Sequence, residues 1–159
     1  MKISGFVFVF AFLISACTTP PAAIKPAFDL EAAKAAINES NKTYGDGFVK
    51  KDSSLFLGKY TKDACLFVAG MPKLCGAGGV GGFFNAAYMG MGVRNVSVKM
   101  EEVFGGADGL TEVGVYQLFG AGDKLLDKGK YIIAWKQEDG KWKMHRDMFT
   151  TDMPPPAAK

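Results

Sequence analysis

Apolar and polar residues alternate most clearly in the last third of the chain, on both sides of Asp139-Gly140. Residues 129–138 and 141–150 are rich in aromatic and β-branched side chains, and Asp-Gly between two such runs is typical of a two-residue hairpin turn. This turn pairs Glu138 with Lys141. The register that follows pairs Gln137 with Trp142, Trp135 with Met144, Ile133 with Arg146, and Tyr131 with Met148.

Side chains alternate across a strand, so the last four of these pairs share one face of the sheet. That face is apolar and aromatic, and its only formal charge is Arg146. His145 and Asp147 fall on the opposite face. An apolar face with a single cation fits the lining of a pocket, and it fits equally a core whose arginine extends into solvent. The pattern predicts that Arg146 lies on the opposite face of the sheet from His145 and Asp147, so an inward Arg146 would leave those two facing outward.

Upstream of the hairpin, the pattern changes from helical spacing to strand-like runs. It predicts a helix over 29–51 that Asp29 caps, a short helix over 52–59, a turn at 60–63, a strand at 64–69, a glycine-rich loop at 76–82, a helix at 80–91, and strands at 94–104, 110–120 and 124–136. Helices followed by four long antiparallel strands predict an α+β fold, in which a curved sheet surrounds a conical cavity. We expect one domain over residues 29–153, followed by a proline-rich tail at 154–159.

The N-terminal residues have the pattern of a bacterial export signal. Lys2 supplies the positive charge, and the apolar run at 6–14 is shorter than the ~20 residues of a membrane span. Leu-Ile-Ser-Ala-Cys at 13–17 is similar to a lipobox. We therefore expect a signal peptide at 1–16, a lipid on Cys17, and a tether at 17–28. The expected location is the cell envelope, membrane-anchored and facing the periplasm, and Thr18 favours the outer membrane.

Composition and cysteine spacing exclude several classes of function. Hydrophobic residues at 48% indicate a globular domain, and a net charge of +3 is too small and too dispersed to indicate a nucleic-acid partner, so we predict none. Cys65 and Cys75 flank Gly70, so a hairpin there would place them opposite each other as a disulfide, with two free thiols as the alternative. We predict no metal site, because two cysteines and a distant histidine make no zinc pattern. We predict no cofactor, because the glycine-rich loop lacks a βαβ frame.

The order of elements resembles the NTF2-like, ketosteroid-isomerase-like α+β cone. The ending GKYIIAWKQEDGKWKMHRDMFTTDMP is similar to the DUF4440 and SnoaL-like branch, and residues 60–64 match a motif before its first strand. The resemblance covers residues 29–154 and implies a homodimer through the outer face of the sheet. It aligns Tyr44 with an oxyanion-hole tyrosine, and Tyr60 with a tyrosine of the same hydrogen-bond network.

The same alignment places Val68 at the catalytic base of the steroid isomerases, and Ile132 or Ile133 at their protonated acid. That chemistry needs both carboxyl groups, so we do not expect steroid isomerase activity. We expect instead a lipid-anchored protein that binds a small apolar or amphipathic molecule, with room for an anionic group at Arg146. The candidate ligand-binding residues are Tyr44, Tyr60, Arg146, Tyr131, Tyr88 and Trp135.

Two other functions remain open from the residues. The first is an isomerase or dehydratase that uses Asp63 or His145 as a base, with Asp147 orienting the histidine. Asp63 could equally be a turn carboxylate that accepts hydrogen bonds from backbone amides. His145 and Asp147 could equally belong to a hydrogen-bond network on the surface. Arg146 likewise fits an ion pair with Asp63 or Glu102. The second is a structural dimerisation module whose cone is filled by its own side chains.

Overall fold

A computed structural model describes residues 27–154, so the predicted signal peptide and Cys17 lie outside the described residues. The helices are α1 (Leu30–Lys42), α2 (Asp46–Lys50), α3 (Ser53–Leu57), α4 (Gly76–Asn85), the π-helical η1 (Ala86–Gly90) and the 3-10 turn η2 (Ala121–Asp123). The strands are β1 (Tyr60–Val68), β2 (Leu74–Cys75), β3 (Asn95–Gly106), β4 (Gly109–Phe119), β5 (Leu125–Glu138) and β6 (Lys141–Thr151). Within residues 27–154, none of the helices has the length and apolarity needed to span a membrane.

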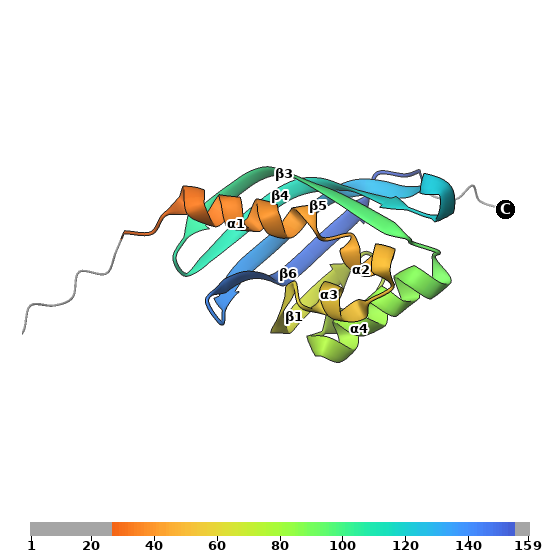
Figure 1. Ribbon diagram of the computed structural model, residues 1–159, viewed down its shortest axis with the longest axis horizontal. Coiled ribbons are helices and arrows are strands. Elements are labelled where there is room, and N and C mark those ends of the chain that lie inside the picture. The colour runs from red at the N-terminus through yellow and green to blue at the C-terminus, as the bar shows by residue number, and fades with distance from the viewer. Residues whose placement is uncertain (1–26, 155–159) are drawn as a thin grey trace, which may run out of the picture.

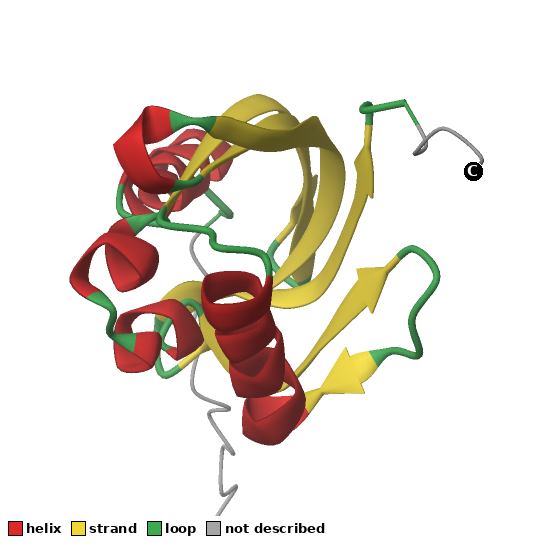
Figure 2. Ribbon diagram, turned by 90° about the vertical axis from the view of Figure 1, so that its right-hand side faces the viewer, coloured by secondary structure: helices red, strands yellow, loops and turns green. Residues whose placement is uncertain are grey.

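The strands form one curved sheet in the order β2-β1-β6-β5-β4-β3. Figure 1 shows α1 lying across the sheet, and Figure 2 shows how the sheet curls toward the helices. This arrangement confirms the predicted α+β cone. Four of the strand pairs are antiparallel, but β1 and β6 are parallel, so the sheet is mixed.

The helix predicted over 29–51 is interrupted, and this prediction was wrong. Asp29 caps α1 as expected, because its Oδ1 accepts the backbone N–H of Ala32 at 2.9 Å. The chain then turns at residues 43–45 before α2 begins. A Cβ on Gly45 would lie 2.3 Å from Oδ1 of Asn95, so the missing side chain lets this turn lie against β3.

Two other element boundaries differ from the prediction. Residues 60–63 begin β1 instead of forming a turn, because Tyr60 already pairs with Met144 of β6. The glycine-rich stretch begins helix α4 instead of forming a loop. Cys65 and Cys75 are register partners on β1 and β2, and a disulfide joins them.

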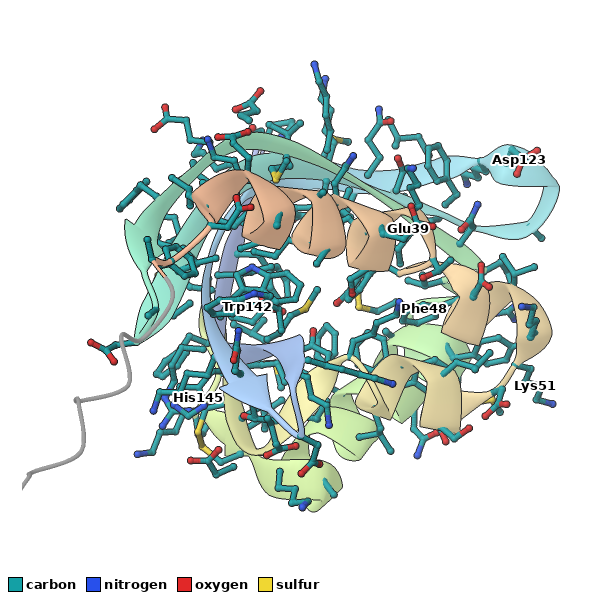
Figure 3. The ribbon with its side chains drawn as sticks, turned by 60° about the vertical axis from the view of Figure 1, so that its left-hand side comes forward. Glu39, Phe48, Lys51, Asp123, Trp142 and His145 are labelled. Carbon is teal, nitrogen blue, oxygen red and sulfur yellow. A yellow bond between two sulfur atoms is a disulfide. The ribbon has the colours of Figure 1, made fainter. Side chains whose placement is uncertain are left out.

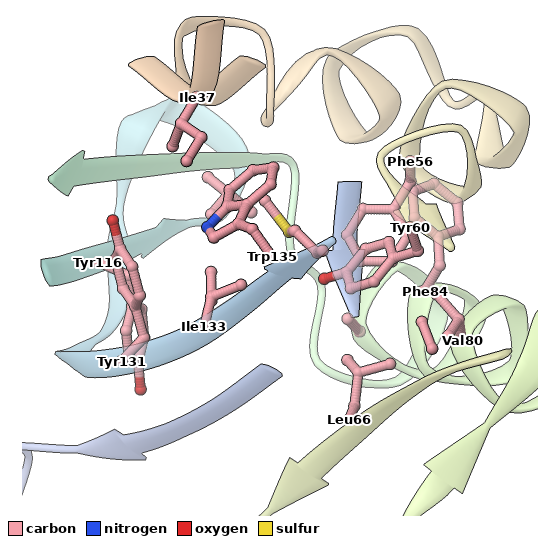
Figure 4. Packing of buried hydrophobic residues seen from close by; sticks show 14 of the residues in the cluster. Ile37, Phe56, Tyr60, Leu66, Val80, Phe84, Tyr116, Tyr131, Ile133 and Trp135 are labelled. Atoms are coloured by element: carbon pink, nitrogen blue, oxygen red, sulfur yellow. The ribbon is translucent and has the colours of Figure 1, made fainter. Parts of the chain in front are cut away.

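Buried side chains fill the end of the cone nearest the β5–β6 turn. Figure 4 shows Ile37 of α1 above Trp135 and Ile133 of β5, and all three are buried. Across the cone, the rings of Phe56 and Tyr60 lie with their centroids 5.2 Å apart. This packing closes one end of the cone and leaves the other end open.

The hairpin around Asp139-Gly140 forms with the predicted register only as far as Trp135 and Met144. A β-bulge follows, in which His145 is the extra residue, so Ala134 pairs with Arg146. From there, Ile133 pairs with Asp147, and Tyr131 with Phe149.

A shift of one residue moves every later side chain to the other face of the sheet. The predicted pairs of Ile133 with Arg146 and of Tyr131 with Met148 were therefore wrong. The predicted sides were wrong as well: Asp147 is 4% exposed and faces the cone, whereas Met148 is 55% exposed. The bulge thus exchanges the cation expected inside the cone for a carboxylate.

Candidate functional site

The open end of the cone holds a cavity of about 450 Å³. Small-molecule sites in proteins commonly enclose ~300–1,000 Å³. Most of its lining is apolar: Phe48, Phe56, Val68, Met71, Leu74, Phe83, Ala87, Met91, Val93, Val96, Val98, Leu118, Ile133, Met144 and Phe149. An open cavity of this size argues against a cone filled by its own side chains.

Asp147 is a buried carboxylate in the wall of this cavity. The hydroxyl of Tyr60 donates to its Oδ2 at 2.7 Å. The hydroxyls of Tyr44 and Tyr60 lie 2.8 Å apart, and Tyr44 is the donor because Tyr60 already gives its proton to Asp147. Among the described residues, no donor reaches Oδ1 of Asp147, so this oxygen is available to a bound molecule.

Burial raises the pKa of Asp147 to about 6, and the hydrogen bond from Tyr60 acts against this increase while the charge of Glu112 adds to it. Burial also raises the pKa of Tyr44 and of Tyr60, so both hydroxyls stay protonated at neutral pH. Asp147 therefore titrates near neutrality, in a range where a carboxyl group can both take and give a proton.

A second carboxylate, Asp127, lies in the cavity wall near the start of β5. Tyr116 donates its hydroxyl to Oδ2 at 2.9 Å, and Thr151 donates to Oδ1 at 2.5 Å. A Cβ on Gly129 would lie 2.8 Å from Cε1 of Tyr116, so this glycine makes room for the phenol ring. Both oxygens of Asp127 are thus engaged, unlike those of Asp147.

Glu112 of β4 is fully buried behind the cavity wall. It accepts hydrogen bonds from Nδ2 of Asn41 at 2.6 Å, the hydroxyl of Tyr131 at 2.7 Å and Nε1 of Trp135 at 2.8 Å. Burial raises its pKa, and these donors oppose the increase. A Cβ on Gly114 would lie 2.4 Å from the oxygen of Tyr131, so glycine lets the phenol cross β4 to reach Glu112. Glu112 joins α1 to the sheet and orients Tyr131, which lines the cavity.

The structure divides the predicted ligand-binding residues. Tyr44 and Tyr131 line the cavity, and Tyr60 lies directly behind Asp147. Trp135 is held by Glu112 outside the lining. Tyr88 packs beneath Arg94, whose guanidinium carbon lies 4.1 Å from the ring centroid, and it does not line the cavity either.

Arg146 lies outside the cavity, which corrects its predicted role as a ligand contact. Its Nη1 donates to the backbone oxygens of Asp63 at 3.0 Å and of His145 at 2.7 Å. His145 sits in the bulge with its Nδ1 3.0 Å from Oγ1 of Thr61. These residues form a cluster between β1 and β6, and the predicted pairing of His145 with Asp147 does not form. Figure 3 shows His145 near the edge of the molecule, well away from Phe48 in the cavity wall.

The two weak catalytic candidates in this cluster are held in their ordinary charge states. Burial lowers the pKa of His145, and the charge of Arg146 lowers it further, so the ring is neutral at pH 7. A hydrogen bond from Thr61 lowers the pKa of Asp63, which is exposed to solvent. Neither group lines the cavity, so neither is placed to act on a molecule bound there.

Sequence reasoning missed Glu112, Tyr116 and Asp127. Alternation along β4 does contain a signal, because Leu110, Glu112 and Tyr116 share one face, and Leu110 and Tyr116 are large residues typical of an inner face. A glutamate on the same face as these two residues indicates a carboxyl group that points into the protein. Asp127 has no comparable local signal, because it lies next to a turn where acidic residues are common.

No known family model matches the sequence, and no curated protein matches it. Several solved structures, however, are similar to this chain in fold. An NTF2-like protein with a cystatin-like fold from Novosphingobium aromaticivorans matches with a TM-score of 0.63 at 14% identity, over 81% of this chain and 88% of that chain. A ketosteroid isomerase-like protein from Erwinia carotovora atroseptica matches with a TM-score of 0.62 at 17% identity, over 76% and 96%. The hexachlorocyclohexane dehydrochlorinase LinA-type3 from Novosphingobium barchaimii matches with a TM-score of 0.59 at 19% identity, over 81% and 93%.

These similarities establish that the protein has the NTF2-like, cystatin-like cone fold. At such low identities they establish the fold alone. The narrower resemblance to the DUF4440 and SnoaL-like branch stays a prediction.

Proposed function

We propose that the cone binds a small, largely apolar molecule, and that a polar group of this molecule hydrogen-bonds to Asp147. The observation that supports this proposal is an apolar cavity of about 450 Å³ with a buried carboxylate in its wall. Oδ1 of Asp147 accepts no hydrogen bond from the described residues, and a hydrogen bond from a bound donor to this charged group would contribute ~1.5–3 kcal/mol. The apolar walls would supply affinity, and Asp147 would set the orientation.

Binding of the neutral dye Nile red tests this proposal. We expect saturable binding of one dye molecule per chain, followed by fluorescence. Leu118→Trp narrows the cavity and should weaken binding at least tenfold, because Leu118 is part of the lining. Gln117→Trp is the matched control, because it enlarges the exposed side chain next to Leu118, which points away from the cavity and does not line it. Equal binding by wild type and Leu118→Trp would contradict the proposal.

A second candidate function is proton transfer on the bound molecule, and the titration of Asp147 near pH 6 favours it. The sequence alignment assigned the acid of the steroid isomerases to Ile132 or Ile133, and Ile133 is the cross-strand partner of Asp147. A carboxyl group therefore lies beside that position, on the neighbouring strand. Asp147 would take a proton through Oδ1 while Tyr60 holds Oδ2.

Exchange of deuterium from solvent into β-tetralone, an apolar ketone with acidic carbon-bound protons, tests this candidate by mass spectrometry. The enzyme hypothesis expects exchange faster than in buffer, and loss of that exchange in Asp147→Asn. The Asn side chain still accepts a hydrogen bond from Tyr60, so the variant should fold and bind the ketone. Exchange at the wild-type rate in Asp147→Asn would exclude this residue as the base.

We also propose, from the sequence pattern, that Cys17 carries a lipid that holds the protein at the envelope membrane, with the domain in the periplasm. Cys17 lies outside the described residues, so the test is biochemical. In a bacterial host, the Cys17→Ser protein should leave the membrane fraction for the soluble fraction. Retention in the membrane fraction would exclude this anchor.

A homodimer through the outer face of the sheet is a further proposal. Ile132 and Met148 are cross-strand partners on that face and are 52% and 55% exposed, so they form an apolar pair open to solvent. Ile132→Asp should convert a dimer to a monomer in sedimentation. A wild-type protein that sediments as a monomer would exclude the dimer.

A further inference from the structure

The lining of the cavity offers hydrogen-bond acceptors and negative charge, with no cation among the described residues. Its charged groups are Asp127 and Asp147, and no lysine, arginine or histidine of the described chain belongs to it. Arg146, the cation expected there, lies outside. We infer that the cone selects a molecule whose polar end is a neutral or cationic hydrogen-bond donor, such as an alcohol or an amine, and that it discriminates against carboxylates and phosphates. This inference rests on the proposed binding function, because it specifies the chemistry of the molecule bound there.

The tyrosine hydroxyls do not change this balance, because each one donates to an acceptor within the protein. Tyr60 donates to Asp147, and Tyr44 donates to Tyr60. Tyr131 donates to Glu112, and Tyr116 donates to Asp127. Burial raises the pKa of all four phenols, so these protons stay in place. An anion entering the cavity would therefore find no free donor among these four hydroxyl groups.

The threonines of the lining add no buried donor. The hydroxyl of Thr151 donates to Asp127, and Thr150 is exposed near the end of β6. Apolar walls exclude water, so the repulsion between a bound anion and Asp147 would be weakly screened. For the same reason, a bound ammonium or hydroxyl group gains from meeting the carboxylate there.

The two carboxylates mark the two ends of the apolar wall. Asp147 pairs with Ile133, and Asp127 lies six residues before Ile133 on β5, which is roughly 20 Å of strand. The side chains of Tyr131 and Phe149 lie between them on paired positions of β5 and β6. Asp147 offers a free oxygen to the head of a ligand, whereas both oxygens of Asp127 already accept hydrogen bonds. The apolar body of the ligand would extend along this wall.

Displacement of Nile red by three molecules with one decyl chain tests the inference at pH 8, where Asp147 is ionised. Decylamine and decanol should displace the dye, and decanoate should require a concentration about tenfold higher than decylamine. Displacement by decanoate at the same concentration as decylamine, or a lower one, overturns the inference alone. A wild-type protein that does not bind the dye overturns the proposed function, and with it the inference.

Two matched variants locate the source of the preference. Asp147→Asn should reduce the preference for decylamine over decanoate about tenfold, because it removes the charge that meets the ligand. Asp108→Asn removes a carboxylate from the exposed turn between β3 and β4, and it should leave the preference unchanged. Circular dichroism establishes that both variants fold. If both variants keep the wild-type preference, Asp147 does not select the ligand.

Discussion

Two buried carboxylates lie in one row across the sheet, on either side of Ile133. Glu112 on β4 accepts three hydrogen bonds and lies outside the cavity lining, whereas Asp147 on β6 accepts one and borders the cavity. Both are almost completely buried, so burial does not distinguish them. The number of hydrogen-bond donors distinguishes them. A carboxylate whose oxygens are all engaged stabilises the fold, whereas one with a free oxygen beside a cavity is available to a ligand.

The two groups are also linked electrostatically. The charge of Glu112 contributes to the raised pKa of Asp147, although burial is the larger cause. Neighbouring strands lie ~4.8 Å apart, so the backbones of Glu112 and Asp147 are about 10 Å apart across β5. The fully bonded carboxylate thereby helps to keep the other protonatable near neutral pH.

The largest expected effect is on stability when Glu112 is removed. Glu112→Ala leaves the donors of Asn41, Tyr131 and Trp135 without their acceptor inside the protein. We expect a loss of about 3 kcal/mol or more in the free energy of unfolding, measured with urea. Glu102→Ala, at an exposed position of β3, is the control and should change stability by less than about 0.5 kcal/mol. Equal effects of the two variants would mean that the buried network is not stabilising.

The next effect is a dependence of stability on pH that belongs to Asp147. Its folded pKa of about 6 lies above the ordinary value of 3.8, so folding takes up a proton between these two values. The stability that the protonated form contributes is complete below the unfolded pKa and is lost as the pH rises through the folded pKa. Asp147→Asn has no such loss, so its stability relative to wild type should rise by about 2–3 kcal/mol between pH 4 and pH 8.

Unfolding of both proteins in urea at several pH values measures this difference. Subtraction of the two curves cancels the titration of every other carboxyl group that the substitution leaves unchanged. A difference that stays constant across this range would show that Asp147 titrates at an ordinary value in the folded protein.

Removing one donor from each carboxylate gives a smaller and matched pair of changes. Tyr131→Phe leaves Glu112 with two of its three donors, whereas Tyr60→Phe leaves Asp147 with none among the described residues. Each should cost about 1–2 kcal/mol of stability. Only Tyr60→Phe should raise the pKa of Asp147 further, because its hydrogen bond stabilises the ionised form. A carboxyl-carbon NMR titration measures that pKa, and equal shifts in both variants would contradict the contrast.

The smallest expected effect is that of Arg146→Ala on ligand binding. The guanidinium bonds to the backbone of Asp63 and His145 outside the cavity, and does not reach its lining. The affinity for Nile red should therefore stay within about twofold of wild type, or ~0.5 kcal/mol. A tenfold loss of affinity would place Arg146 back in the binding site.

Local signals in the sequence predicted much of the fold. The turn at Asp139-Gly140, the cap at Asp29 and the positions of Cys65 and Cys75 across a short hairpin agree with the structure. Two of the predicted ligand-binding residues, Tyr44 and Tyr131, line the cavity, and their role in binding stays a prediction. Each of these expectations depends on residues that are neighbours in sequence or on plain strand alternation.

The candidate site was less predictable, because its polar groups meet across elements distant in sequence. Glu112 accepts hydrogen bonds from residues of α1 and β5, and Asp147 accepts one from a residue of β1. The number of donors around a carboxylate, and hence its role, is set only when these elements pack together. The pKa of each carboxyl group is likewise set only by tertiary packing, because burial is the main cause of the raised pKa of both Glu112 and Asp147.

By itself, the sequence determined the α+β cone, the hairpin and the apolar character of the inner face, because these follow from periodicity and turn chemistry. Only the tertiary structure decided which charged group faces the cavity. Strand β6 pairs with β5 on one side and in parallel with β1 on the other, and His145 is accommodated there as a bulge. Because side chains alternate along a strand, that single extra residue turned Arg146 outward and Asp147 inward.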